Sequence, residues 1–359
     1  MRHLIVCVIL FGLISCKKEK VNKPRKFSKV EIDTLWEDRE LSVRALDLGE
    51  NDEFYFAGNN TKFGKSYIDG FDPFREVVIR GYDSLLTESL LEFRSVSKTS
   101  DHYFFFSVLS PGYLFRLKID EFFDGLPERV YQETHPKAFY DSMDFWNDQE
   151  GIAIGDPTDD CMSVIITRDG GSTWAKMSCD DLPKAKDGEA AFAASDTNIS
   201  IVGDHTWVAT GGKTSRVLYS PNKGKTWEVY KTPIIQGKET TGMYSIDFYD
   251  EKNGFAIGGD YTKPNDTLNN KIRTNDGGKT WTVVANGKGP GYRSCVQYVP
   301  NSNGKELVAI GFKGIDYSND AGDTWKHLSD EGFYTIRFLN DSTAYAAGNR
   351  RISKLTFRE

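Results

Sequence analysis

The sequence of 359 residues has little of what defines several large classes of protein. Apart from one short stretch at its start it has no long hydrophobic run, which excludes a polytopic membrane protein. Proline is scarce, with 12 residues, and 39% of the chain is hydrophobic, so neither a disordered nor a collagen-like chain fits. The 45 Lys and Arg are outnumbered by 52 Asp and Glu, and the net charge of −7 argues against nucleic acid as a general partner.

The common catalytic and cofactor signatures are also missing. The chain contains no HExxH, GxSxG or CxxC motif. Residues 58–66 have one residue too many between their glycines for a phosphate loop, and residues 287–291 lack the β-α context of a dinucleotide site. The acidic residues 156–160 supply no complete ligand set for a hard cation. We therefore expect no cofactor and no metal site, and we assign no catalytic residue.

What the chain does have is aromatic side chains and glycine. Aromatic residues make up 13% of it and there are 33 glycines, whereas stretches rich in Ala and Leu are few. This composition favours many short strands joined by tight turns, so we expect an all-β fold.

The first 15 residues are expected to leave the mature chain. Residues 1–3 are a short cationic start, and residues 4–14 form an apolar run shorter than the ~20 residues that span a bilayer. The end of this run, up to Cys16, resembles the lipobox of bacterial lipoproteins. We predict a signal peptide at 1–15, lipid on Cys16 and a basic tether over 16–27, the alternative being an uncleaved membrane anchor. The protein would then be exported and held on a bacterial membrane, periplasmic or at the cell surface, with the outer membrane favoured.

One octapeptide occurs four times, beginning at residues 167, 220, 274 and 318. Each copy fits the pattern S/T-x-D-x-G-x-T-W, with Asn in place of Asp in the second copy. The Asp or Asn side chain can accept hydrogen bonds from the backbone of a tight turn, and Gly supplies a conformation that is costly for other residues. We therefore expect a structural role in a hairpin and no chemistry. The residues concerned are Asp169, Trp174, Asn222, Trp227, Asp276, Trp281, Asp320 and Trp325.

A second pattern consists of a strand that ends near a small residue, a polar turn, and a strand rich in Ala, Ile and Gly. Four-stranded repeats of roughly 40 to 50 residues are typical of propeller blades, so we expect residues 28–359 to form one seven-bladed β-propeller with antiparallel blades. The last unit stops after three strands, and residues 29–36 alternate like a strand without a blade of their own, so we predict that they close the ring. The seven first strands are read at 45–48, 95–97, 142–145, 191–193, 245–248, 294–296 and 335–338.

The octapeptides and the repeat resemble the BNR, or Asp-box, propellers of the photosystem II stability/assembly factor-like family, over roughly residues 28–359. That name is also attached to many proteins of non-photosynthetic bacteria. The resemblance implies a propeller that binds and helps assemble other proteins, with the boxes away from the functional face.

Two cysteines flank the first octapeptide. Cys161 and Cys179 are nearly equidistant from its turn, so they are expected to lie opposite each other across an antiparallel hairpin. Opposed strand residues have Cα atoms about 4.5 to 5.5 Å apart, within the range of roughly 4.4 to 6.8 Å found in disulfides. Because exported proteins meet oxidants, we predict a bridge between them, the alternative being two reduced thiols one register apart. Cys295 is expected to be a buried free thiol.

The expected binding face is the one opposite the octapeptides. Aligning the seven first strands on their small residue places a column of side chains at the mouth of the central channel. Guanidinium groups offer planar, bidentate donors, so this column is suited to capture a carboxylate or phosphate. The alternative is that its arginines only neutralise neighbouring carboxylates. The candidates are Arg44, Arg94, Asp141, Glu189, Tyr244, Arg293 and Tyr334.

Two classes of function remain open. The first is a non-enzymatic, lipid-anchored scaffold that binds an envelope protein or protein complex through the channel-mouth face. The second is a glycan-active enzyme of the sialidase or glycoside hydrolase type, or a glycan-binding propeller, since three arginines are similar to the carboxylate-binding triad of sialidases. Sialidases, however, have six blades and an Arg-Ile-Pro motif that this sequence lacks. We favour the protein-binding scaffold.

Overall fold

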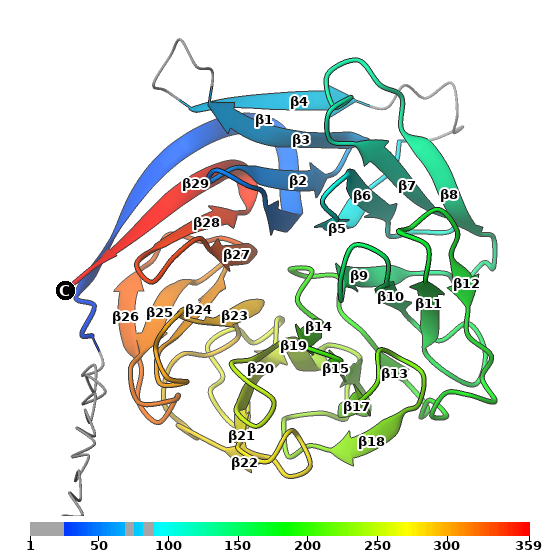
Figure 1. Ribbon diagram of the computed structural model, residues 1–359. Helices are drawn as coiled ribbons and strands as arrows, with labels where there is room; N and C mark the ends of the chain where they lie inside the picture. The colour runs from blue at the N-terminus through cyan, green and yellow to red at the C-terminus, as the bar shows by residue number, and fades with distance from the viewer. Residues whose placement is uncertain (1–24, 69–74, 82–89) are drawn as a thin grey trace, which may run out of the picture.

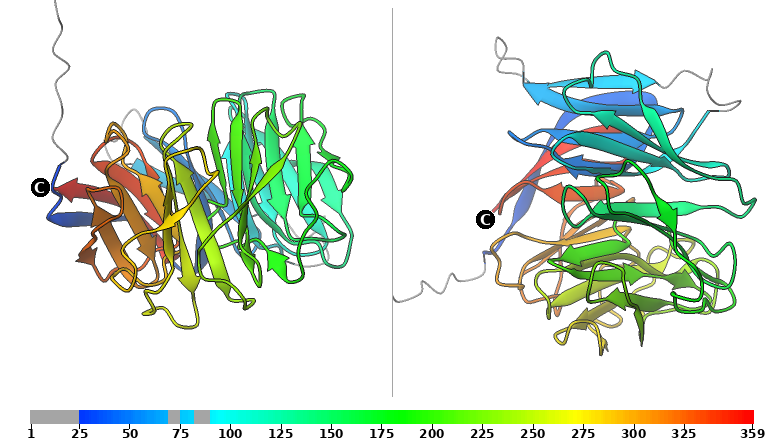
Figure 2. Two further views of the ribbon diagram at one scale, coloured as in Figure 1. Left: turned by 90° about the horizontal axis from the view of Figure 1, so that it is seen from below. Right: turned by 45° about the vertical axis from the view of Figure 1, so that its right-hand side comes forward.

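The computed structural model describes residues 25–68, 75–81 and 90–359, and the chain folds there into β-strands without an α-helix. The predicted signal peptide and Cys16 lie outside the described residues. Short antiparallel sheets follow one another around a common centre (Figure 1) and stand side by side in a flat body (Figure 2). The expected all-β fold is confirmed, and its architecture is that of a β-propeller.

In the described ranges no helix is long and apolar enough to cross a bilayer.

Four of the sheets have four strands each, running from the centre of the molecule outward. Hydrophobic side chains from both faces of neighbouring sheets pack together, so the core consists of separate clusters between the sheets. The four sheets are β5 (Phe93–Lys98), β6 (His102–Ser107), β7 (Gly112–Lys118) and β8 (Glu128–Glu133); β9 (Tyr140–Phe145), β10 (Gly151–Gly155), β11 (Ser163–Thr167) and β12 (Ala175–Lys176); β14 (Ile199–Val202), β15 (His205–Ala209), β17 (Arg216–Ser220) and β18 (Glu228–Lys231); and β23 (Cys295–Tyr298), β24 (Leu307–Gly311), β25 (Gly314–Ser318) and β26 (Lys326–Ser329).

A seven-stranded sheet joins the two ends of the described chain. Its first strand, β1 (Lys29–Leu48), pairs with β29 over Lys29 to Glu37 and with β2 from Val43 onward, so the predicted pairing of the N-terminal strand with the last unit is present. The other strands are β2 (Phe54–Gly58), β3 (Lys62–Ile68), β4 (Arg75–Gly81), β27 (Thr335–Phe338), β28 (Thr343–Ala347) and β29 (Asn349–Arg358).

The sixth sheet corrects one expectation about the first strands. Residues 191–193, read as a first strand, lie outside all strands, and the sheet that follows them begins at β14 instead. The sixth sheet contains β13 (Glu189–Ala190), β16 (Gly211–Gly212), β19 (Thr241–Phe248), β20 (Gly254–Asp260), β21 (Lys271–Thr274) and β22 (Thr282–Val283).

The four octapeptides form the same turn. In the first, the Asp169 carboxylate accepts hydrogen bonds from the Thr173 backbone N–H and hydroxyl, and Thr167 Oγ1 accepts one from the Gly171 N–H. Gly171 has φ +78°, in the left-handed region where glycine avoids the steric cost of a Cβ. The same bonds recur in the third and fourth turns. In the second turn the two bonds from backbone N–H groups are kept, but Asn222 Nδ2 donates to the Thr226 hydroxyl instead of accepting from it. These bonds hold the backbone of each turn in one conformation, so their role is structural.

The structure joins Cys161 and Cys179, the pair singled out from the sequence, by a disulfide with Cα atoms 5.4 Å apart. The bridge lies just beyond the short pairing of β11 with β12 and ties the outer strand of this sheet to its neighbour. Cys295 is free and buried in β23.

Candidate functional site

A segment of irregular backbone fills the middle of the propeller. We call residues 191–198 the plug, because its hydrogen bonds reach sheets on every side of the channel. The Asp196 carboxylate accepts from the backbone N–H groups of Val96 and Met143, and Ser195 Oγ donates to the Ser294 carbonyl. On a further side, Thr335 Oγ1 donates to the Ser195 carbonyl. The plug therefore gives the channel a floor and separates a cavity at its mouth from one beneath.

The cavity at the mouth, called the mouth cavity below, has a volume of about 520 Å³. Its floor is the first part of the plug, and its walls come from several sheets. Four of the seven sequence candidates line it: Arg44, Arg94, Tyr244 and Tyr334.

Arg44 lines this cavity and forms no ion pair with any described residue. Its guanidinium lies over the ring of Tyr334, with Cζ 3.8 Å from the ring centre, and Nη1 donates to the Ala194 carbonyl of the plug at 3.3 Å. Its Nε is buried without a hydrogen-bond partner, and no carboxylate of the described chain pairs with Arg44. Burial lowers the pKa of Arg44, and the nearby charge of Arg94 lowers it further. An anion entering the cavity would relieve both effects.

Arg94 is held in place from two sides. Its Nη1 donates to the Ala193 carbonyl of the plug at 3.0 Å, and its Nε and Nη2 contact Glu92 at 2.8 and 2.6 Å. Glu92 neutralises Arg94 but leaves the charge of Arg44 uncompensated. The uncompensated positive charge on this wall of the mouth cavity is therefore that of Arg44 alone.

The other wall is aromatic. Phe192 of the plug stacks on Tyr244 with ring centres 3.9 Å apart, and Tyr292 meets Tyr244 edge to face at 4.8 Å. Tyr261 and Phe312 complete this wall and expose 48% and 43% of their surface. Exposed aromatic side chains beside a polar cavity are typical of binding surfaces. The mouth cavity thus offers a guanidinium next to flat apolar surface.

Three sequence candidates do not line the mouth cavity. Glu189 is buried and is bound by Arg216 and by the Thr210 hydroxyl. Arg293 is buried and pairs with Asp316 at 2.6 Å. Both residues therefore follow the alternative stated above, in which the charges at these positions are neutralised by ion pairs within the protein.

Asp141 is also hidden behind the cavity wall. It is fully buried, and burial together with the charge of Asp156 raises its pKa well above the usual range of a carboxyl group. Asp156 itself lines the mouth cavity, and burial raises its pKa to about 6.

Three aromatic residues of the wall were missed in the sequence. They are Phe192, Tyr292 and Phe312. Tyr292 directly precedes the candidate Arg293, so shifting the aligned column by one residue would have found it, since alternate residues of an extended segment point to opposite sides.

A second, smaller cavity of about 180 Å³ lies beneath the plug and is lined by four aspartates: Asp47, Asp144, Asp196 and Asp247. The one guanidinium there, Arg337, donates to the Ile336 and Asp196 carbonyls and pairs with no carboxylate among the described residues. Burial, and for Asp144 also the charge of Asp47, raises the pKa values of Asp144 and Asp247 to about 7. Burial also raises the pKa values of Asp47 and Asp196.

These carboxyl groups predict that stability falls as the pH rises. A carboxyl whose pKa is about 3.8 when unfolded and about 7 when folded binds more protons in the folded state between these values. We expect the melting temperature to drop by several degrees from pH 5 to pH 8. The Asp144→Asn/Asp247→Asn double variant should lose most of that drop, which thermal unfolding across this range would measure. An unchanged pH dependence in the variant would refute the assignment.

The fold places the chain among the β-propellers. No protein-family model matches the sequence, and no curated protein matches it. Among solved structures it is similar to YCF48 bound to D1 peptide, with 12% identity, 94% of this chain and 97% of that one covered, and a TM-score of 0.64. It is also similar to YCF48 from Cyanidioschyzon merolae, with 13% identity, 92% of this chain and 99% of that one covered, and a TM-score of 0.64. A third similar structure is that of virginiamycin B lyase from Staphylococcus aureus, with 11% identity, 91% of this chain and 99% of that one covered, and a TM-score of 0.58. At these identities the likeness concerns the fold alone, and it extends to an enzyme as well as to a peptide-binding protein.

Proposed function

We propose that this protein is a non-enzymatic propeller that binds a protein partner in the cell envelope and acts as an assembly scaffold. In this proposal a lipid on Cys16 holds it at a bacterial membrane. The anchoring rests on the lipobox pattern and the apolar run before it. The mouth cavity is the proposed binding site.

We further propose that the sheets amount to seven blades closed into a ring. The seven-stranded sheet would supply two of them: β27 to β29 with the first half of β1, and the second half of β1 with β2 to β4. The four-stranded sheets and β19 to β22 would supply the others. Closure by β1 would leave no free sheet edge between the first and last blades. The four octapeptide turns would be BNR repeats.

The observation that carries the binding proposal is the state of Arg44. A guanidinium that is largely withdrawn from water without a carboxylate partner is unfavourable, so it favours an anion delivered from outside. The neighbouring aromatic wall favours an anion attached to an apolar or aromatic group, as in a polypeptide. The structure of YCF48 bound to D1 peptide supports the choice of a polypeptide, since a propeller of similar fold binds a peptide.

Affinity capture from the native host after mild cross-linking tests the proposal. The Arg44→Gln variant should recover at least about tenfold less of a specific envelope protein than the wild type, because the buried charge that attracts its anion is gone. Its melting temperature should be unchanged or higher, since an unpaired buried charge has been removed.

A matched control is Arg129→Gln, which removes an exposed arginine from the outer strand β8. This control should recover as much partner as the wild type. Equal recovery with Arg44→Gln would refute the site. If no protein is recovered with any form, the scaffold proposal fails and glycan binding takes its place.

A further inference from the structure

We infer that the partner binds as an extended acidic segment that reaches from the mouth cavity to a second anchoring point beside the N-terminal strand. This inference rests on the proposed function and adds to it a class of ligand and a second site. The second site is a cavity of about 600 Å³ where β1 leaves β29 and turns to β2, which we call the seam cavity.

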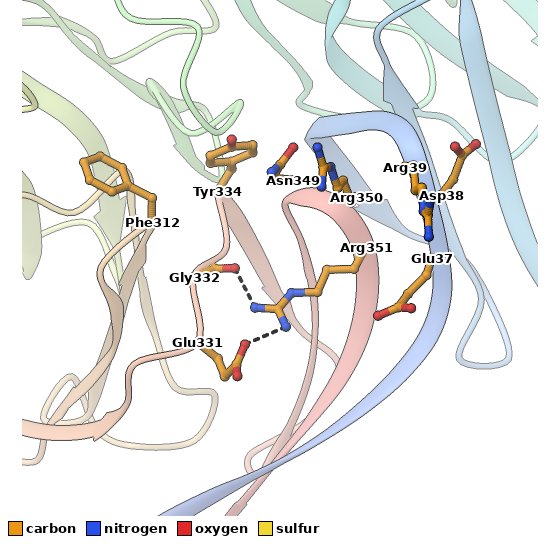
Figure 3. A pocket seen from close by; sticks show the side chains of 10 residues that line it. All are labelled: Glu37, Asp38, Arg39, Phe312, Glu331, Gly332, Tyr334, Asn349, Arg350 and Arg351. Carbon is orange, nitrogen blue, oxygen red and sulfur yellow. Dashed lines mark hydrogen bonds and ion pairs between the residues drawn. The ribbon is translucent and has the colours of Figure 1, made fainter.

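The two cavities adjoin. Phe312 and Tyr334 line both of them, so a ligand that passes over these two rings is in contact with each cavity. Figure 3 shows Phe312, Tyr334, Asn349, Arg350 and Arg39 following one another across the seam cavity. The combined surface is elongated, which suits an extended chain better than a compact anion.

Unpaired positive charge lies at the far end of this surface. Arg39 and Arg350 are exposed, and neither forms an ion pair within the described ranges. The acidic neighbours are mostly occupied, because Asp38 pairs with Lys62 and Glu331 pairs with Arg351.

Among the described lining residues only Glu37 is a carboxylate without an ion pair, so the free charge in the seam cavity is positive. Together with Arg44 in the mouth cavity, this arrangement matches a segment with acidic groups towards both ends. Phe312 and Tyr334 between them offer flat apolar surface for the middle of that segment.

The backbone at Arg350 points to a role outside folding. This residue has φ +66°, in the left-handed region that glycine adopts without strain and long side chains rarely adopt. It sits opposite the irregular part of β1, where the register shifts between Glu37 and Ser42. An arginine in this position holds its guanidinium at the seam at a cost in backbone strain.

Two synthetic fluorescent peptides test the inference by anisotropy at 150 mM salt. One is the blocked tripeptide Asp-Phe-Asp, which is long enough for the mouth cavity alone. The other is a nine-residue peptide that continues through Gly and Ser to two further Asp residues and spans about 30 Å when extended. We expect the longer peptide to bind the wild type at least about tenfold more tightly.

The Arg39→Gln/Arg350→Gly double variant should bind both peptides with the affinity of the wild type for the tripeptide. Since glycine relieves the backbone at position 350, its melting temperature should not fall, which separates binding from folding. Arg44→Gln should weaken the binding of both peptides, whereas Arg129→Gln should weaken the binding of neither.

Equal binding of the two peptides, or an unaffected long peptide in the double variant, would overturn the second site while leaving the mouth cavity standing. Binding that Arg44→Gln does not weaken would refute the mouth cavity and with it this inference. Failure of both peptides to bind, or the same loss with Arg129→Gln, would refute the acidic segment as ligand.

Discussion

A chain that begins at residue 38 is expected to lose its cooperative unfolding transition. The first half of β1 pairs with β29 from Lys29 to Glu37. Its apolar side chains pack on two clusters, Val30 and Ile32 beside Phe357 and Leu355, and Leu35 and Trp36 beside Ile352. Removing this strand exposes apolar surface and a row of backbone groups along β29. The combined loss of stability should amount to a large share of the ~5 to 15 kcal/mol of unfolding free energy that keeps an ordinary domain folded.

The control is a chain that begins at residue 25, which keeps β1 and the contacts of Arg25 with Glu306 and of Phe27 with Tyr317. It should unfold at the temperature of the longer chain. Circular dichroism during heating would compare the two, together with aggregation, because an unpaired strand edge promotes association. A chain without residues 25–37 that unfolds cooperatively within about 5 °C of the control would contradict this account of β1.

Trp207→Ala is expected to be the most destabilising single substitution, at about 3 to 5 kcal/mol. The side chain is completely buried between two sheets. Its ring stacks on Phe248 with centres 3.7 Å apart, and its Nε1 donates to the Gly277 carbonyl in the third octapeptide turn. The substitution removes this stack, leaves a cavity and takes the donor from the partly buried Gly277 carbonyl, so the melting temperature should fall by about 5 to 15 °C.

Trp227→Ala provides the comparison. Trp227 is only partly buried, and its Nε1 donates to the Gly224 carbonyl within its own turn. The Trp227→Ala substitution should therefore lower the free energy of unfolding by about half as much as Trp207→Ala, or less. Chemical denaturation would measure this for both variants. Equal losses would show that the inter-sheet position of Trp207 adds nothing.

The parts of the fold that local patterns encode could be predicted. In each octapeptide turn the Asp or Asn side chain and the first hydroxyl bond backbone N–H groups of the same turn, so much of its conformation is encoded in eight neighbouring residues. The alternation of residues 29–36 likewise indicated a strand, and the unit of three strands at the end of the chain indicated its partner.

The plug could not be predicted, because its conformation is set by groups far away in the sequence. Residues 191–193 resemble a first strand in composition, yet the hydrogen bonds of Ala193 and Ala194 go to Arg94 and Arg44 across the channel. The same is true of the candidates Glu189 and Arg293. Their partners, Arg216 and Asp316, come from later strands, so the sequence alone could not distinguish a free arginine from a neutralised one.

The claim that a partner protein docks on the mouth of the propeller is tested most directly by photo-cross-linking in the native host. A photoreactive phenylalanine at Tyr261 would report on the mouth, and one at Lys279 on the third octapeptide turn. These positions lie at opposite ends of one sheet, because Tyr261 follows Asp260 of β20 while the turn follows Thr274, which pairs with Gly254 at the other end. We predict a cross-linked envelope protein from Tyr261 and none from Lys279. The same cross-link from Lys279, or from Lys279 alone, would contradict the account.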